Sequence, residues 1–303
     1  MAGFYTISNS IKLGRALHVT DFANDINALT TTDADYFSQH YIDPKKVTII
    51  PPSEKENLIL IYIESLEDSY KNPAFFGRNL LADLNPFEKD GLSLRLNVVG
   101  TTTYTAGAHF AVSCGVVSKP VLFNNMSANQ QEKMIKTVFQ NALCLSDILK
   151  ANGYYNVFMV SSNDRTGGLG NFYQTHHFDE IYSLSYWQTH GYGYVAHWQN
   201  HSYSSTSIQK QGKWGIYDKY ILEEGYKKLA ALQEKRDHDG QPFFLTITTI
   251  DIHPPADSSC TANIANDEKK PFDKVVECTA ANLAIFLKNS QQNNLFKNSK
   301  VLI

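Results

Sequence analysis

NLILIYIES, residues 57–65, is the stretch that decides the fold of this chain. It is short and almost wholly apolar, and it ends in Glu64 and Ser65. A continuous apolar run of this length predicts a strand that is buried on both faces, as in a parallel sheet. Similar runs recur as VFMVSS at 157–162, FFLTITTI at 243–250 and KVLI at 300–303.

Helical patterns alternate with these runs. A capping box at Ser127 predicts a helix through Phe139, and Gly153 stops a short helix predicted over 144–150. Longer apolar stripes predict helices over 217–236 and 273–288. Strands that alternate with helices indicate an α/β fold with helices on both faces of the sheet. We expect a lead-in segment over residues 1–55 and one domain over residues 56–303.

Composition excludes several classes of protein. The 303 residues are 43% hydrophobic and 19% charged, which is typical of a globular protein with a full core. The net charge is −3 and there is no basic run, so no nucleic-acid partner is expected. The longest apolar run, residues 58–63, is far short of the ~20 residues that span a bilayer. The first residues also lack the pattern of a signal peptide, which predicts a soluble chain without a targeting signal.

The stretch GTTTYTAGAHFAVSCG, residues 100–115, has two interpretations. Its hydroxyl groups can cap the first turn of a helix, with Thr105 or a neighbour as the cap. Alternatively, Thr105 is a nucleophile at a helix N-terminus, where backbone N–H groups and the helix dipole favour an anion.

Polar residues follow several of the predicted strands. Glu64 follows the first run, and the threonines follow a strand predicted at 94–99. Asn163, Asp164 and Arg165 follow VFMVSS, and Asp251 and His253 follow FFLTITTI. Because ligands of open α/β sheets bind beyond the carboxyl ends of the strands, these side chains are expected to converge. A carboxylate, a hydroxyl and a histidine there suit metal-assisted phosphoryl or sulfuryl transfer.

The aromatic segment 185–207 also has two interpretations. It holds tryptophans, tyrosines and histidines among glycines and serines. Its rings could stack on a ligand, or the segment could fold back onto the core. The four cysteines, Cys114, Cys144, Cys260 and Cys278, allow three pairings in an oxidising compartment, or they remain reduced. Their spacing does not indicate a zinc site.

Six phrases, in order along the chain, resemble the sulfatase-like phosphoglycerol transferases, nearest to the branch that decorates periplasmic glucans and more distantly the lipoteichoic acid synthases. The similarity runs from about residue 38 to the last residue, and the phrases are NLILIYIESLEDSY, GTTTYTAGAHFAVSCG, CLSDILKANGYYNVFM, NFYQTHHFDEIY, WGIYDKYI and FFLTITTIDIHPP. The resemblance implies an alkaline-phosphatase-like sheet that is cut short at its C-terminal side in this chain.

The resemblance also implies roles for single residues. Glu64 takes the position of a glutamate that ligates a divalent metal, Mn²⁺ or Mg²⁺. Thr105, placed by its distance from Cys114, takes the position of the nucleophile, which is also a metal ligand. His253 takes the position of a histidine that contacts the transferred headgroup. The expected reaction moves phosphoglycerol from phosphatidylglycerol to a glycan through a phosphoglycerol-threonine.

The chain departs from the family pattern in three ways. An Asp-His pair that completes the metal site is expected after Ile303, so the 303 residues alone are expected to bind Mn²⁺ poorly and to be inactive. Leu169 stands where relatives place a basic substrate contact, and Arg165 is the nearby candidate for that contact. The membrane helices of the family are missing, so membrane association is expected through segments outside this chain.

The resemblance favours the pairings Cys114–Cys144 and Cys260–Cys278 and a location at the periplasmic face of the bacterial inner membrane. Two other functions remain open. One is a hydrolase of sulfate or phosphate esters, although the chain has no Cys-x-Pro-x-Arg phrase of the kind that matures to formylglycine. The other is a non-catalytic remnant that only binds glycan or lipid headgroup.

Overall fold

The computed structural model divides the chain into two compact units, residues 1–49 with 97–120, and residues 50–96 with 121–303. The residues that it describes are 42, 44–48, 50, 52–94, 102–115, 140, 142–192, 210–262 and 271–303.

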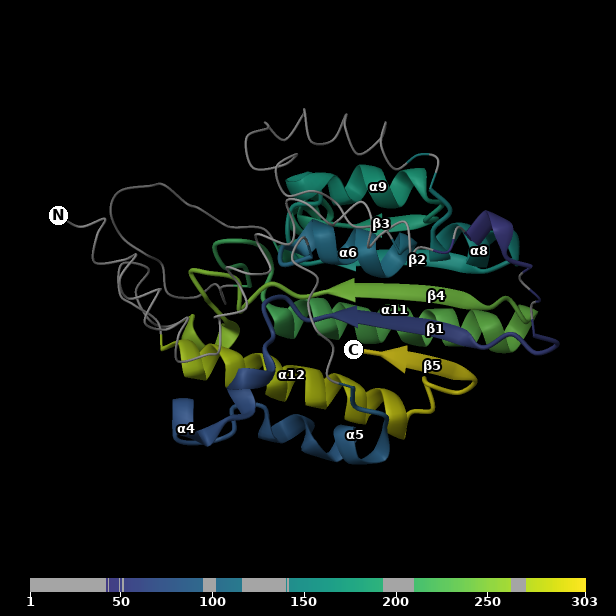
Figure 1. Cartoon of the computed structure of the whole chain (residues 1–303). Helices are drawn as coiled ribbons and strands as arrows, with labels where there is room; N and C mark the ends of the chain where they lie inside the picture. The colour runs from purple at the N-terminus through teal and green to yellow at the C-terminus, as the bar shows by residue number, and fades with distance from the viewer. Residues whose placement is uncertain are drawn as a thin grey trace. The chain divides into compact units, whose positions relative to one another are not determined.

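A parallel sheet forms the centre of the second unit (Figure 1). Its strand order is β3-β2-β4-β1-β5, and every neighbouring pair of strands is parallel. The strands are β1 (Asn57–Tyr62), β2 (Tyr155–Val160), β3 (Glu180–Tyr182), β4 (Phe243–Thr248) and β5 (Ser299–Leu302). The four apolar runs of the sequence are therefore strands of this sheet, as predicted.

Burial of the strands follows their position in the sheet. All six residues of β4, the middle strand, are buried, and so are five of the six residues of β2. In contrast, β5 lies at an edge and alternates between half-buried and exposed residues. The continuous apolar runs of β2 and β4 thus mark strands that are buried on both faces.

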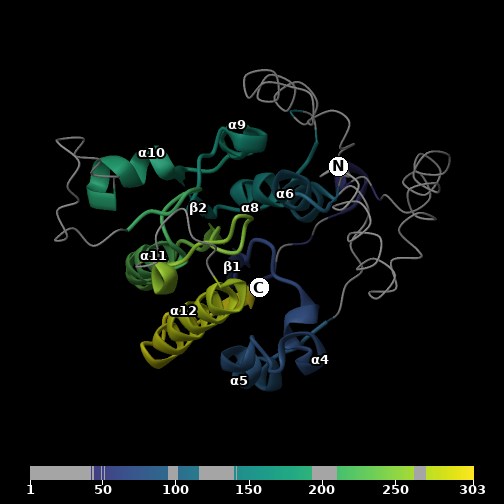
Figure 2. The ribbon, with the colours of Figure 1, turned by 90° about the vertical axis from the view of Figure 1, so that its left-hand side faces the viewer.

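Each face of the sheet packs against its own set of helices (Figure 2). Leu245 and Ile247 of β4 share a core with residues of α11 (Asp218–Asp239) and α12 (Phe272–Gln292). Phe244, the residue between them, points to the opposite face. There it joins an aromatic cluster with Phe158, Tyr173 and Phe178. Helices on both faces, as predicted, define the α/β class.

The other helices of this unit are short. Their bounds are α4 (Pro73–Phe76), α5 (Asn85–Asp90), α8 (Leu145–Ala151), α9 (Leu169–Thr175) and α10 (Leu184–Trp187), with single turns at η2 (Asp68–Lys71), η3 (Ala82–Leu84), η5 (Thr166–Gly168), η6 (Gln188–Tyr192) and η7 (Ser259–Thr261). The predicted helix over 144–150 is α8. Its first turn is capped by Asp147, whose carboxylate accepts the Cys144 N–H at 2.9 Å.

Helix α6 (Thr105–Cys114) belongs to the first unit. Its N-cap is Tyr104, in an extended conformation, and the Tyr104 side chain makes no capping hydrogen bond. Thr105 is the first helical residue, so the interpretation of Thr105 as the cap is wrong. The helix ends at Gly115, which has a left-handed φ of 65°.

Several predictions fall outside the described residues. They are the strand at 94–99, of which only Leu94 is described, the helix from Ser127 to Phe139, and the aromatic residues after 192. The described start of the aromatic segment folds back onto the core, because Trp187 is buried and its indole N–H donates to the Val160 carbonyl at 2.8 Å. In the described parts of the chain, no helix is both long enough and apolar enough to cross a membrane.

Candidate active site

Three of the four predicted site residues follow strands of the one sheet. Glu64 lies two residues after β1, Arg165 lies five residues after β2, and His253 lies five residues after β4. Because these strands are parallel neighbours, their C-terminal ends lie at the same edge of the sheet. Thr105, the fourth residue, belongs to the first unit.

Glu64 sits in a turn that is hydrogen-bonded to the neighbouring strand. Its backbone N–H donates to the Thr249 hydroxyl at 3.1 Å, and the Thr249 N–H donates to the Tyr62 carbonyl at 3.0 Å. Ser65, the next residue, has a left-handed φ of 55°, and its hydroxyl donates to the Glu64 carboxylate at 3.1 Å. The turn therefore holds the half-buried carboxylate of Glu64 at the end of β1.

A reciprocal pair of aspartates fixes the segment after β4. Asp218 accepts the N–H groups of Ile250 at 2.7 Å and Asp251 at 3.2 Å, and the Thr279 hydroxyl at 2.9 Å. In return, the Asp251 carboxylate accepts the Asp218 N–H at 3.1 Å. These contacts tie the start of α11 to the residues that lead to His253. We call them the aspartate clasp.

Burial raises the pKa of Asp218 to about 6, and the negative charge of Glu64 adds to the rise. The hydrogen bonds from Ile250, Thr279 and Asp251 act in the opposite direction but are outweighed. The clasp therefore places a carboxyl group with an elevated pKa inside the protein, and this group interacts electrostatically with the Glu64 carboxylate.

His253 is positioned by its own turn. Its backbone N–H donates to the Ile250 carbonyl at 2.9 Å, and its Nδ1 lies 3.0 Å from the Pro254 carbonyl oxygen. A carbonyl oxygen only accepts, so Nδ1 carries the proton of this hydrogen bond. In the neutral ring, Nε2 then has a lone pair and can accept a hydrogen bond from a substrate hydroxyl.

Trp214 packs beside His253, and it is a candidate that sequence analysis missed. The two ring centroids are 4.6 Å apart, and the indole is 38% exposed. The next residue, Gly215, runs against the end of β2, where a Cβ would lie 2.2 Å from the Ser161 carbonyl oxygen. Only glycine allows this approach. The Trp-Gly pair in the phrase WGIYDKYI was the available signal, but it does not say which residue the indole contacts.

Arg165 lies in the loop after β2 and Leu169 begins the helix that follows, and the two side chains have different environments. Arg165 is exposed, and its backbone N–H donates to the Asn163 side chain at 2.9 Å. Leu169, the first residue of α9, is buried in the core. The departure at Leu169 is therefore a packing position here, and Arg165 is the cation of this loop that reaches solvent.

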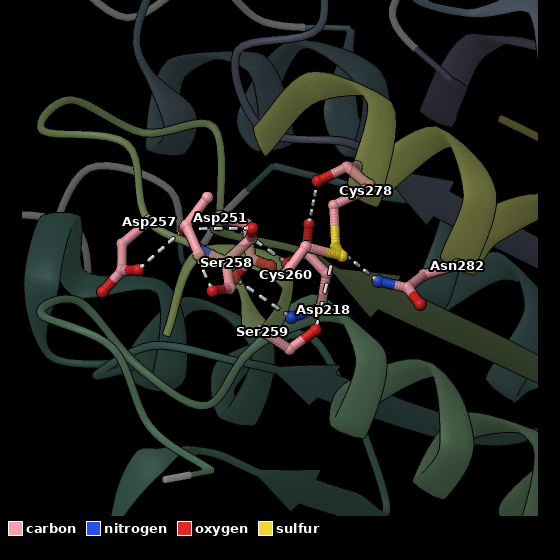
Figure 3. The surroundings of a disulfide bond; sticks show 10 residues. Asp218, Asp251, Asp257, Ser258, Ser259, Cys260, Cys278 and Asn282 are labelled. Carbon is pink, nitrogen blue, oxygen red and sulfur yellow. Dashed lines mark hydrogen bonds between the residues drawn. A yellow bond between two sulfur atoms is a disulfide. The ribbon is translucent and has the colours of Figure 1, made fainter. Parts of the chain in front are cut away.

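A disulfide stabilises the region behind His253. Cys260 and Cys278 are bonded, as predicted, and join η7 to α12 (Figure 3). The Asn282 side chain donates to Cys278 Sγ at 3.5 Å. Ser258, buried beside the bond, caps η7. Cys114 and Cys144 each take part in a disulfide as well, so none of the four cysteines is free and the reduced alternative is wrong.

The donor chemistry of the predicted metal ligands fits a hard divalent cation. Glu64 offers carboxylate oxygens and Thr105 offers a hydroxyl, and oxygen ligands suit Mg²⁺ and Mn²⁺. Among the described residues, no group of three His, Cys, Asp or Glu ligands includes Glu64.

Comparison with known proteins shows the family. The sulfatase family model matches residues 56–284, so the chain belongs to the sulfatase family. Members of the sulfatase and alkaline-phosphatase-like superfamily generally use a divalent metal. The described fold is consistent with this family, because a solved structure of the alkaline phosphatase superfamily shares it.

Individual relatives show to which members of the family the chain is similar. Phosphoglycerol transferase I of Salmonella arizonae is 30% identical over 282 residues, which is 90% of this chain and 33% of that protein. The chain thus spans about a third of the length of the curated relatives that it matches. A Vibrio parahaemolyticus protein of the alkaline phosphatase superfamily has a TM-score of 0.56 and 17% identity, over 83% of this chain and 54% of its own. The lipoteichoic acid synthase LtaP from Listeria monocytogenes has a TM-score of 0.57 and 14% identity, and the match covers 85% of this chain and 59% of LtaP.

Proposed function

We propose that this domain transfers phosphoglycerol from phosphatidylglycerol to a hydroxyl group of a glycan. The observation that carries the proposal is the position of Thr105 at the first residue of α6. The N–H groups of a first helical turn have no acceptor within the helix, and together with the dipole they favour a phosphate. The resemblance to phosphoglycerol transferase I supports phosphoglycerol as the group that is transferred.

Thr105 is the nucleophile in this proposal, and Glu64 and Thr105 are ligands of one divalent cation, Mn²⁺ or Mg²⁺. A threonine hydroxyl is a weak nucleophile at neutral pH. The cation would supply Lewis-acid stabilisation of the threonine alkoxide and of the phosphate charge.

The reaction has two steps. The Thr105 oxygen loses its proton and attacks phosphorus, and the bond from phosphorus to the diacylglycerol oxygen breaks. Diacylglycerol leaves with a proton on that oxygen, and phosphoglycerol remains on Thr105. A glycan hydroxyl then attacks phosphorus, the bond to Thr105 breaks, and Thr105 regains a proton. His253 and Arg165 contact the substrates, and the Nε2 lone pair of His253 accepts a glycerol hydroxyl.

The compartment is part of the proposal. Phosphatidylglycerol is a membrane lipid, so the reaction belongs at a membrane surface. Disulfides persist in oxidising compartments, which favours the periplasmic face of a bacterial inner membrane over the cytosol. Membrane association through segments outside this chain is included in the proposal.

The test is to locate the covalent intermediate. In the full-length protein that carries this sequence, phosphatidylglycerol without acceptor should leave a phosphoglycerol group on Thr105, detected by peptide mass spectrometry. Thr105→Ala should lose the adduct and turnover, because no other hydroxyl replaces the nucleophile. Thr103→Ala, a change at an exposed threonine two residues away, is the matched control and should keep both. An adduct on any other residue would overturn the assignment.

A further inference from the structure

A cleft of about 370 Å³ lies on the flank of the second unit, where the loop after β2 meets α9 and the residues after β3. We call it the flank cleft. Its polar lining consists of Asp164, Arg165, Asn171, Gln174, Ser183 and Ser185. Tyr186 supplies an aromatic wall. The volume lies within the range of sites that hold small molecules, ~300–1,000 Å³.

The cleft is shaped by close backbone approaches. A Cβ on Gly170 would lie 2.3 Å from Asp164 Oδ2, so glycine leaves room for that carboxylate above the first turn of α9. The Gly170 N–H also donates to the Asp164 carbonyl at 2.9 Å. On the opposite wall, the Leu184 N–H donates to the Ser162 carbonyl at 3.0 Å. The two walls are therefore both tied to the loop that follows β2.

The chemistry of the lining indicates a neutral ligand with many hydroxyl groups. Asp164 and Arg165 carry opposite charges, so the lining has no surplus of positive charge to attract a phosphate. The amides of Asn171 and Gln174 and the hydroxyls of Ser183 and Ser185 both donate and accept hydrogen bonds. Such a set matches the alternating donors and acceptors of a sugar, and Tyr186 can cover its apolar C–H groups.

We propose that the flank cleft binds a sugar unit of the glycan acceptor, so that Arg165 contacts the acceptor and not the phosphoglycerol headgroup. This inference rests on the proposed function. The cleft begins at the loop after β2, which is next to the loop after β4 that carries His253; the loop after β1, with Glu64, follows on the far side of β4. A glycan held in the cleft would extend along this edge of the sheet.

The test measures binding without turnover. The 303-residue chain is titrated with a panel of neutral β-linked glucose disaccharides, and affinity is followed by calorimetry and backbone amide shifts. Saturable binding should move the amides of residues 164–174 and 183–186. Gln174→Ala should weaken it by about threefold to tenfold, the loss of one hydrogen bond. Gly170→Ala should weaken it further, because the added Cβ displaces the Asp164 carboxylate.

Gln291→Ala is the matched control, because Gln291 is also an exposed helical glutamine and lies on α12. It should bind like the wild type, and thermal unfolding should show that every variant is folded. Absence of binding, equal affinities of Gln174→Ala and Gln291→Ala, or displacement of the disaccharide by inorganic phosphate would each overturn the proposal. Since no step of the assay needs Thr105, sugar binding together with a failed adduct test would retain the cleft and reject the transferase.

Discussion

Asp218 is the residue on which the segment leading to His253 most depends. It is fully buried, and its carboxylate serves two backbone N–H groups and one hydroxyl. A side chain that cannot accept would leave these donors unpaired. Each unpaired buried polar group costs about 1–3 kcal/mol. The aspartate is therefore a structural acceptor, and its negative charge is a cost of that role.

Two variants, Asp218→Asn and Asp218→Ala, should separate the contribution of the acceptor oxygens to stability from the contribution of the negative charge. Burial raises the pKa of Asp218 to about 6 from an ordinary 3.8. Between these values the folded state holds a proton that the unfolded state releases, so this group's contribution to stability falls as pH rises through the window. Asparagine keeps an acceptor oxygen and does not titrate. The unfolding free energy of Asp218→Asn should therefore rise relative to that of the wild type as the pH increases from 4 to 7.

Urea unfolding at several pH values measures this difference. Asp218→Ala should be less stable than Asp218→Asn by about 2–4 kcal/mol at pH 7, because it lacks the acceptor. A difference between wild type and Asp218→Asn that does not change with pH would contradict the account of the pKa.

At the scale of elements, the disulfide holds η7 to α12. Cys260 and Cys278 are 18 residues apart in the sequence, and the bond closes a loop of that size. The same region carries the cap of η7 and, through Thr279, a donor to the aspartate clasp. The bond and the clasp thus anchor the segment after β4 from two sides (Figure 3).

Replacing both cysteines tests this anchor. The double variant Cys260→Ser, Cys278→Ser should lose about 3 kcal/mol of unfolding free energy, the usual effect of opening a loop of this length. Hydrogen exchange should speed up first and most at residues 256–262, whereas β4, where all residues are buried, should change only by the loss of global stability. Faster exchange that begins in β4 would show that the bond supports the sheet instead of the loop.

At the scale of the whole molecule, all four cysteines are oxidised, and each of the two units contains at least one of them. The pairing of Cys260 with Cys278 is confirmed. The pairing of Cys114 with Cys144 stays a prediction from the resemblance. A chain with every cysteine in a disulfide is suited to an oxidising compartment.

Non-reducing peptide mapping of protein exported to an oxidising compartment should find two linked peptides, one with Cys114 and Cys144 and one with Cys260 and Cys278. The same protein made in a reducing cytosol is the control and should be less stable, since its loops are not closed. Free thiols at all four positions in the exported protein would remove the main physical argument for the proposed periplasmic location.

The sequence by itself determined the class of fold and most of the elements. A continuous apolar run such as 243–250 predicts a doubly covered strand because burial on both faces requires apolar side chains at every position. The C-terminal end of α8 was predictable from Gly153, because a left-handed turn is a local property of glycine. The positions of Glu64, Thr105 and His253 came from phrases shared with a family, which a single chain's periodicity does not contain.

Only the tertiary structure decided how side chains distant in the sequence meet. Trp214 contacts His253, 39 residues later, because Gly215 lets the backbone approach the end of β2. Asp218 binds the N–H groups of Ile250 and Asp251 because α11 packs against the sheet that ends there. The flank cleft depends on Gly170 in the same way. Each of these contacts arises from strand register and close backbone approach, and these are properties of the packed chain that no local sequence pattern encodes.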